Sequence, residues 1–292
     1  MPSVGGFVWP IGTWMAGGVV LLTTPGPKKP LVQLLRDKPT HLFVSTAQLE
    51  QLVQGLPQEF TPQTGMATYV AGSVLPRALN HAARGRLGQA LIMIYGSTEV
   101  GTVTVAPAAH VDIKPGLTGY VCPPAEVQIV DENGLEVANG ATGIVRTRNV
   151  GQSHCYLDDE ETTAQAFDGT WFYPGDLGAL GQRGELFVQG RVRELMNFGG
   201  VKVTPDAIDE VAAQVAGVVE AASFAVKDKA GKEWPQIAVV AGPDFDEARL
   251  KTSVKASFPS LPALKVIKVD KLPRNDMGKI LRQDLAGKYP MA

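Results

Sequence analysis

Five consecutive residues, Tyr95-Gly96-Ser97-Thr98-Glu99, carry groups that could together hold a nucleotide. The tyrosine ring could stack on a base, and the glycine could let a ligand approach the backbone. The hydroxyl of Thr98 could bond a phosphate, and the Glu99 carboxylate could hold a divalent cation such as Mg²⁺. On its own the stretch is equally compatible with a strand that runs into a polar turn.

The segment that leads into these residues has to position them. Residues 90–94 form a continuous apolar run, which predicts a short buried strand. Before it, strand-like and helix-like segments alternate, as in βαβ units with a largely parallel sheet. Ligands bind beyond the carboxyl ends of the strands in such sheets, and Tyr95 would lie at such an end.

The remaining segments predict an α/β fold. The expected elements before Tyr95 are a turn and buried strand over residues 17–22, helices over 31–37, 47–56 and 75–87, and strands over 41–44 and 68–71 with a turn at Gly72-Ser73. The apolar start, residues 1–22, lacks the basic segment of a signal peptide, and we expect it to be core.

After Glu99 the pattern changes to β-formers and turn residues. Residues 126–131 alternate polar and apolar side chains, and the whole of 103–192 predicts a small antiparallel sheet or distorted barrel. From residue 193 the pattern predicts a small α+β module. Its expected elements are a helix over 205–216 capped by Thr204, strands over 218–227, 236–241 and 265–269, and a helix over 246–258.

Bulk properties exclude several classes of protein. The net charge is −2, with 27 basic and 29 acidic residues, which argues against a nucleic-acid binder. No apolar run is long enough to cross a membrane. Cys122 and Cys155 match neither a metal-binding spacing nor a disulfide framework, so we expect a reducing, cytoplasmic setting.

Four further motifs follow the Tyr95 stretch along the chain. They are Tyr173-Pro174-Gly175-Asp176-Leu177-Gly178, Gly190-Arg191-Val192-Arg193-Glu194, Gly199-Gly200-Val201-Lys202-Val203-Thr204-Pro205, and Pro273-Arg274-Asn275-Asp276-Met277-Gly278-Lys279-Ile280. In order and separation they resemble the adenylate-forming superfamily, which comprises acyl- and aryl-CoA synthetases, luciferases and peptide-synthetase adenylation domains. The resemblance covers nearly the whole chain and implies ATP or AMP, Mg²⁺ and coenzyme A as ligands, with a carboxylic acid as the substrate.

In this superfamily the carboxylate of the acid attacks the α-phosphate of ATP, and pyrophosphate leaves. The resemblance implies that Tyr95 stacks on adenine, Thr98 bonds the α-phosphate and Glu99 holds Mg²⁺. Asp176 would accept the ribose hydroxyls, and Arg191 would reach the ribose or the phosphates. The ordinary alternatives are an aromatic at the core edge, a solvated loop acid, a turn-forming aspartate and a surface arginine.

Lys279 would bridge the acid and the α-phosphate in the transition state, with Gly278 allowing the turn that presents it. Arg193 stands at the hinge position about which family members rotate a mobile lid domain, here residues 193–292. Gly199-Gly200 resembles the loop along the pantetheine tunnel. The alternatives are a tail lysine and a plain β-turn.

Two predictions concern the acyl pocket. Gly72 and Ser73 resemble the turn beside the adenine and acyl pocket, and Gly96 would lie on the pocket wall. The motifs also depart from the family, because Pro174 stands where threonine is usual and Cys155 stands where glycine is frequent. A contact from a hydroxyl beside Asp176 is therefore in doubt.

The family's Ser/Thr/Gly-rich phosphate loop is absent from the sequence. We therefore expect residues 1–192 to be a partial large domain, with an α/β part over 1–102, and the chain to be incomplete or inactive alone. Phe7, Val8 and Trp14 would then be exposed and favour a homodimer or a complementing N-terminal fragment. Two functions stay open: an acid–CoA ligase, and a non-catalytic AMP- or CoA-binding or interaction module derived from that family.

Overall fold

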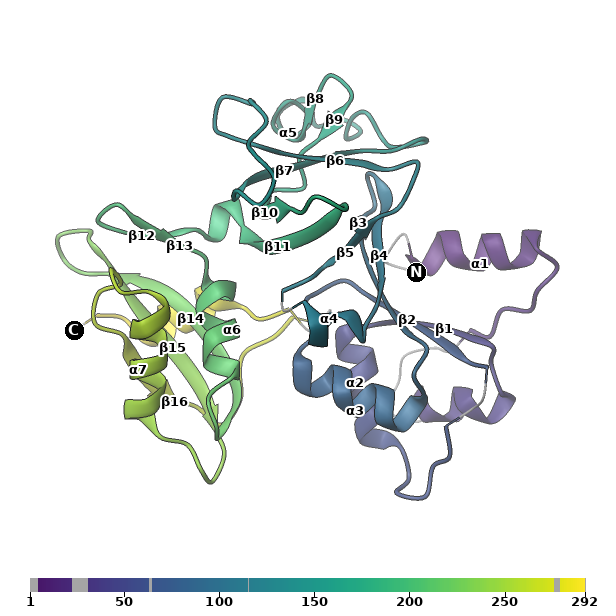
Figure 1. Cartoon of the computed structure of the whole chain (residues 1–292), viewed down its shortest axis with the longest axis horizontal. Coiled ribbons are helices and arrows are strands. Elements are labelled where there is room, and N and C mark those ends of the chain that lie inside the picture. Colours follow the sequence, from purple (N-terminus) through teal and green to yellow (C-terminus); the bar gives the residue numbers. More distant parts are fainter. Residues whose placement is uncertain (1–4, 23–30, 63–64, 115, 276–278, 292) are drawn as a thin grey trace. The chain divides into compact units, whose positions relative to one another are not determined.

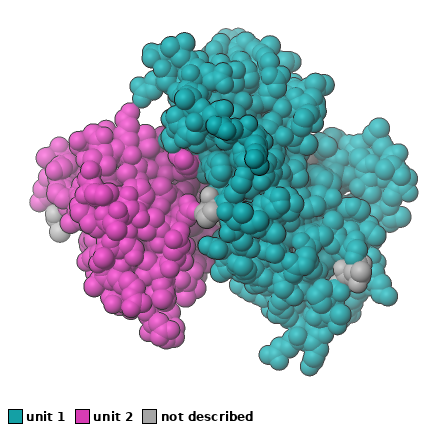
Figure 2. All heavy atoms as spheres, viewed as in Figure 1, with its two compact units in different colours: residues 1–188 teal, residues 189–292 magenta. Residues whose placement is uncertain are grey.

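The computed structural model describes residues 5–22, 31–62, 65–114, 116–275 and 279–291. They form two compact units, Met1–Val188 and Gln189–Ala292 (Figure 2). Each unit has its own hydrophobic cores. The expected functional boundary at residues 192–193 and the mobility of residues 193–292 stay predictions.

The first unit begins its sheet with three parallel strands: β1 (His41–Ser45), β2 (Ala67–Ala71) and β3 (Leu91–Ser97). Helices α2 (Thr46–Gly55) and α3 (Arg77–Leu87) connect them and lie side by side in Figure 1. Short apolar strands alternating with amphipathic helices bury both faces of such a sheet. The core here includes Leu49, Leu52, Leu87 and Leu91, all nearly inaccessible to solvent. The predicted βαβ arrangement is confirmed.

The remaining strands of the first unit continue the same hydrogen-bonded path. The order is β1-β2-β3-β4-β5-β11-β10-β7-β9-β8, with β6 paired to β7. The sequence predicted a small antiparallel sheet or distorted barrel over residues 103–192. The strands there do pair antiparallel, and β4 joins them to β3, so they continue the first sheet. The remaining elements are η1 (Leu31–Asp37), β4 (Gly101–Pro107), α4 (His110–Ile113), β5 (Gly119–Val121), β6 (Glu126–Val130), β7 (Gly143–Arg148), α5 (Glu160–Ala166), β8 (Phe167–Asp168), β9 (Trp171–Phe172), β10 (Asp176–Leu180) and β11 (Glu185–Arg191).

The start of the chain differs from the prediction. Residues 5–15 form helix α1 (Gly5–Met15), which has no buried residue, and no described strand pairs with residues 18–22. Trp9 attaches the helix by packing on the rings of Phe43 and Tyr69, at centroid distances of 5.2 and 4.9 Å. The apolar pattern was a misleading guide, because hydrophobicity alone does not supply a partner to bury against. The predicted exposure of Phe7, Val8 and Trp14 is confirmed.

The second unit is the predicted α+β module. An antiparallel and parallel sheet in the order β14-β15-β16 carries α6, α7 and α8, and the β12-β13 hairpin precedes it. Thr204 caps α6 through its side-chain oxygen, with Pro205 at the first turn, as predicted. The bounds are η2 (Val192–Glu194), β12 (Met196–Phe198), β13 (Val201–Val203), α6 (Pro205–Ala213), β14 (Val218–Lys227), β15 (Glu233–Ala241), α7 (Glu247–Ser257), β16 (Lys265–Lys268) and α8 (Arg282–Lys288).

Two observations concern the setting of the protein. No described helix combines the length and the apolar character that crossing a bilayer requires. Cys122 and Cys155 are both exposed free thiols.

The described core of the second unit can be tested by comparing a buried side chain with an exposed one. Ile208 on α6 is fully buried, and shortening it to alanine should lower the free energy of unfolding by about 2–5 kcal/mol. Val219 is 65% exposed, and Val219→Ala should change that free energy by less than about 0.5 kcal/mol. Urea denaturation followed by circular dichroism measures both variants. Equal destabilisation by the two substitutions would contradict the described core.

Candidate functional site

The parallel pairing of β2 and β3 brings two predicted site segments to one edge of the sheet. Val70 is in register with Met93, so β2 ends at Ala71 on the same side on which β3 ends at Ser97. Gly72 and Ser73 follow β2 there as an exposed turn. The Thr46 hydroxyl donates to the Ser73 carbonyl at 3.2 Å and ties this turn to the start of α2.

Gly96 has a structural reason that the sequence did not show. The β3–β4 hairpin shifts register between Tyr95 and Gly96, and a Cβ on Gly96 would lie 2.0 Å from the Gly101 carbonyl oxygen. No side chain fits so close to backbone, so this position requires glycine. Its expected place on an acyl-pocket wall stays a prediction.

Tyr95 and Asp176 are in direct contact. The Tyr95 hydroxyl donates to Asp176 Oδ2 at 2.6 Å, although the residues lie 81 positions apart. Asp176 is the first residue of β10 and is 2% exposed. A hydrogen bond to a buried carboxylate is short and strong, so it fixes the orientation of the Tyr95 ring. Two of the residues that the sequence assigns to the nucleotide are therefore held together.

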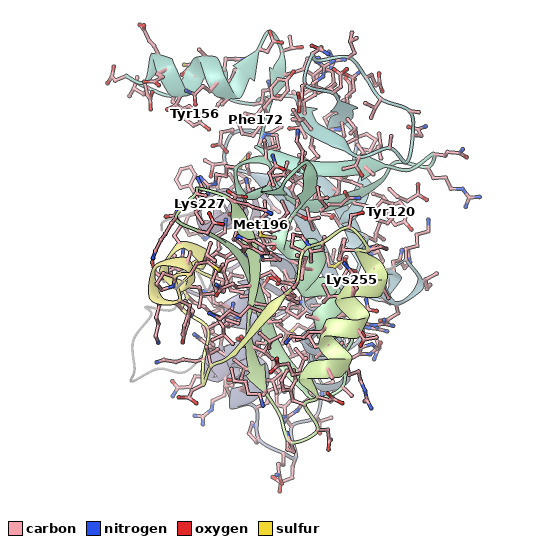
Figure 3. The ribbon with its side chains drawn as sticks, turned by 90° about the vertical axis from the view of Figure 1, so that its left-hand side faces the viewer. Tyr120, Tyr156, Phe172, Met196, Lys227 and Lys255 are labelled. Atoms are coloured by element: carbon pink, nitrogen blue, oxygen red, sulfur yellow. The ribbon has the colours of Figure 1, made fainter. Side chains whose placement is uncertain are left out.

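Glu99 lies in the turn after β3 and accepts a hydrogen bond that the sequence did not predict. The Tyr156 hydroxyl donates to Glu99 Oε1 at 2.7 Å. Burial, followed by the bond to the Glu99 carboxylate, raises the pKa of Tyr156 to about 12. Phe167 packs between Tyr156 and Phe172, with ring centroids 5.5 Å and 5.1 Å from theirs. Figure 3 labels Tyr156 and Phe172. The phenol thus holds Glu99 from an aromatic cluster.

The segment that carries Tyr156 also holds the backbone of this turn. Ser153 N–H donates to the Glu99 carbonyl at 2.7 Å, and the Asn149 side-chain amide donates to the carbonyls of Val100 and Thr102 at 3.1 Å each. Sequence reasoning missed these residues. They make contacts across about fifty positions, and no local periodicity or motif spacing signals such contacts.

The hydroxyls of the site differ in exposure. Thr98 is exposed at the turn, as a phosphate contact would require. Ser97 Oγ is buried and finds no hydrogen-bond partner within the described part of the chain. Leaving a buried hydroxyl unpaired costs about 1–3 kcal/mol. The hydroxyls of Thr104, Thr147 and Ser223 share this property, so it does not single out Ser97 as a functional group.

The donor set suits a cation that arrives with a substrate. No group of three or more His, Cys, Asp or Glu that could hold a metal occurs among the described residues. Glu99 offers one carboxylate, and Mg²⁺ characteristically binds one or two carboxylates together with substrate phosphates and water. The residues present therefore fit Mg²⁺ bound to a nucleotide better than a resident metal.

The second unit holds the other predicted residues. Arg191 ends β11 and is half-buried, and Arg193 is exposed in η2. Gly199 and Gly200 join β12 to β13 with φ of +70° and +99°, and Gly200 N–H donates to Asn197 Oδ1 at 2.8 Å. Two consecutive positive φ angles define a tight hairpin turn that favours glycine at both positions. The geometry by itself is that of a β-turn, the ordinary alternative given for these two glycines. Their role along a pantetheine tunnel stays a prediction.

The backbone of Lys279 is hydrogen-bonded to Asn275. Arg274 and Ile280 form a β-bridge, and Asn275 and Lys279 exchange backbone and side-chain hydrogen bonds of 2.9 Å. The Lys279 ammonium lies 3.2 Å from Glu194 Oε1, with 44% of its side chain exposed. The expected turn at Gly278 lies outside the described residues. Lys279 is therefore not a free tail lysine.

The Tyr156–Glu99 contact can be tested by titration. Glu99→Gln should lower the pKa of Tyr156, because a neutral partner no longer opposes phenolate formation, while burial keeps that pKa above the usual value. Ultraviolet difference titration, with Tyr156→Phe to identify the signal, measures it. Glu136→Gln removes an exposed carboxylate elsewhere in the unit and should leave the titration unchanged. An unaltered Tyr156 titration in Glu99→Gln would show that the two groups are apart.

Comparison with known proteins places this geometry in a family. Residues 3–157 match the AMP-binding enzyme family, and residues 207–279 match the AMP-binding enzyme C-terminal domain. The chain is 30% identical to 4-coumarate–CoA ligase 1 of Glycine max over 228 residues, which is 74% of this chain and 78% of that protein. It is 30% identical to 2-succinylbenzoate–CoA ligase of Geobacillus kaustophilus (strain HTA426) over 276 residues, 92% of this chain and 56% of that protein.

Solved structures agree. The amide bond synthetase McbA from Marinactinospora thermotolerans superposes with a TM-score of 0.84 at 25% identity, covering 94% of this chain and 57% of that one. ATP-bound MatB from Rhodopseudomonas palustris superposes with a TM-score of 0.83 at 28% identity, covering 98% and 57%. The chain thus spans little more than half the length of most of these proteins. It belongs to the AMP-binding enzyme family, and the adenylate-forming superfamily predicted from its motifs is confirmed.

Proposed function

We propose that this chain carries the nucleotide site and the catalytic lysine of an ATP-dependent carboxylic acid–CoA ligase. The observation that carries the proposal is the hydrogen bond from Tyr95, near the carboxyl end of the parallel strand β3, to Asp176; Glu99 follows in the turn after that strand. Open α/β sheets bind ligands at this edge. The names of two relatives, a 4-coumarate–CoA ligase and a 2-succinylbenzoate–CoA ligase, support the class of reaction.

The nucleoside would be held by the first unit. The Tyr95 ring would stack on adenine, with its hydroxyl anchored on Asp176. The Asp176 carboxylate has acceptor capacity beyond one hydrogen bond and would accept the ribose hydroxyls. Gly72 and Ser73, at the neighbouring strand end, would border the adenine and acyl pocket, and Arg191 would reach the ribose or phosphates.

The phosphates would meet Thr98 and Glu99. The exposed Thr98 hydroxyl would donate to the α-phosphate, and Glu99 would hold Mg²⁺ that arrives on the nucleotide. A bound Mg²⁺ neutralises phosphate charge. Tyr156 would keep Glu99 oriented from the opposite side of the carboxylate, through the hydrogen bond to Oε1.

The chemical step transfers an adenylyl group. An oxygen of the acid's carboxylate forms a bond to the α-phosphorus, and the bond from that phosphorus to pyrophosphate breaks. Lys279 would stabilise the charge that the acid and the α-phosphate share, and Arg193 would be the hinge that allows it to approach. The thiol of coenzyme A would then attack the acyl carbon and release AMP, with Gly199-Gly200 along its path.

The acid itself is identified only as a carboxylic acid. The names of the relatives include a succinylbenzoate, a coumarate and a fatty acid. Such variety supports a shared reaction on different acids rather than one substrate.

A second function, binding without catalysis, stays open. The Ser/Thr/Gly-rich run that the family uses for the phosphates does not occur in the sequence. On this alternative the chain is a non-catalytic AMP- or CoA-binding or interaction module.

Exposed apolar side chains on α1 support a macromolecular partner. Phe7, Trp14 and Met15 are 61%, 55% and 85% exposed on one helix, and several large exposed apolar side chains on one element support an interface there. We propose a second copy of the chain or a separate N-terminal fragment as the partner. A single monomeric species in analytical ultracentrifugation would contradict the homodimer.

ATP–pyrophosphate exchange with a panel of acids tests the ligase function. Lys279→Met should lower exchange by about 10²–10³-fold, as for loss of one preorganised donor. Lys251 is a matched control, because it is 46% exposed and paired with Glu247 at 2.7 Å, and Lys251→Met should retain full exchange. Equal exchange by Lys279→Met and wild type would contradict the role of Lys279.

Calorimetry with AMP and with coenzyme A separates the two functions. Binding without exchange on any acid would support the non-catalytic module. Asp176→Asn should weaken AMP binding by roughly 10- to 100-fold, since one charged acceptor of a hydrogen bond contributes about 1.5–3 kcal/mol. Absence of both binding and exchange, in protein shown to be folded, would contradict both functions.

A further inference from the structure

Glu194 lies between two cationic side chains of the second unit. Its Oε1 is 3.2 Å from the Lys279 ammonium, and its Oε2 is 3.7 Å from Arg282 Nε. The Glu194 side chain is 23% exposed. Each carboxylate oxygen thus faces a different cation.

Arg282 is fixed independently of Glu194. Its guanidinium bonds Asp209 Oδ2 at 2.7 Å, Asp206 Oδ1 at 2.5 Å and the Ser223 carbonyl at 3.0 Å, and only 15% of the side chain is exposed. These partners come from α6 and β14, whereas Arg282 begins α8. With two carboxylates and a backbone carbonyl as partners, Arg282 stays in place whether or not Lys279 is near.

The two cations therefore differ in freedom. Lys279 is 44% exposed on a four-carbon stem, and Glu194 is its ion-pair partner in the structure. To act on a phosphate the ammonium has to leave Glu194, because a carboxylate beside it offsets its charge. When it leaves, Glu194 keeps Arg282 as a neighbour and is not left as an uncompensated charge, which would be costly.

We propose that Glu194 is a positioning residue that holds Lys279 in reserve, and that Arg282 keeps Glu194 in place when the lysine departs. The proposal rests on the proposed function in one respect: the lysine is held in reserve for a nucleotide phosphate. The Glu194 carboxylate would compete with that phosphate for the Lys279 ammonium. The carboxylate holds the lysine only weakly, since a partly exposed ion pair contributes only about 0.2–1 kcal/mol.

The pairing can be tested without enzymatic activity. In protein labelled with ¹³C and ¹⁵N at lysine, the side-chain signal of Lys279 is assigned by its loss in Lys279→Met. Glu194→Gln should move that signal, whereas Glu194→Asp, which retains the charge, should move it less. Glu220 pairs with Arg274 at 3.1 Å with similar exposure, and Glu220→Gln is the matched control that should leave the signal in place. An unmoved Lys279 signal in folded Glu194→Gln overturns the inference.

The competition is tested by nucleotide affinity. Glu194→Gln should bind MgATP about two- to fivefold more tightly than wild type, the equivalent of one partly exposed ion pair. In the Lys279→Met background the same substitution should have no effect, because the competition acts through the lysine. Weaker or equal binding in Glu194→Gln, or the same change without Lys279, overturns the inference. If wild type binds no nucleotide, the proposed function fails, and the lysine signal alone decides whether the pairing exists.

Discussion

The hydrogen bond from Tyr95 to Asp176 is the constraint on which the candidate site depends. It joins the end of β3 to the start of β10, two strands that are not neighbours in the sheet order. The parallel pairing of β1, β2 and β3 supplies the edge, and the buried carboxylate of Asp176 fixes where the tyrosine ring points at that edge. Without this bond the side chains of Tyr95 and Asp176 would be positioned only by their separate strands.

The two units differ in how firmly they hold their functional groups. In the first, Tyr95, Asp176, Tyr156 and Glu99 are joined by short bonds at buried or half-buried positions, and charge-assisted bonds of this kind contribute about 1.5–3 kcal/mol each. In the second, Lys279 is held by a partly exposed pair worth about 0.2–1 kcal/mol. This difference suits the proposed reaction, in which the nucleotide would stay on the first unit while Lys279 would move.

Much of this arrangement could be predicted from sequence because its signals are local. The helix cap at Thr204-Pro205 and the strand over residues 218–227 each depend on the types of neighbouring residues. Both lie in the structure where they were expected. Tyr95 and Asp176 could be identified as motif residues from the sequence. That they serve one site followed only from the resemblance to a family, because no periodicity in the sequence links them. Their assigned roles toward a ligand stay predictions.

The parts that could not be predicted depend on contacts between distant segments. Tyr156, Asn149 and Glu194 act through partners 47 to 85 positions away, and a side chain's type says nothing about which partner it meets. The helix at residues 5–15 shows the opposite error, since its apolar residues suggested a core that the described chain does not provide. At Gly96 the sequence predicted a place on the pocket wall but not the packing reason for glycine, which is the close approach of the Gly101 backbone.

A crystal structure of the protein with AMP tests the central claim most directly. The account predicts adenine stacked on the Tyr95 ring, with the ribose hydroxyls within hydrogen-bond distance of Asp176 while the bond between the two residues persists. AMP bound away from these residues, or crystals that admit no AMP at millimolar concentration, would contradict it.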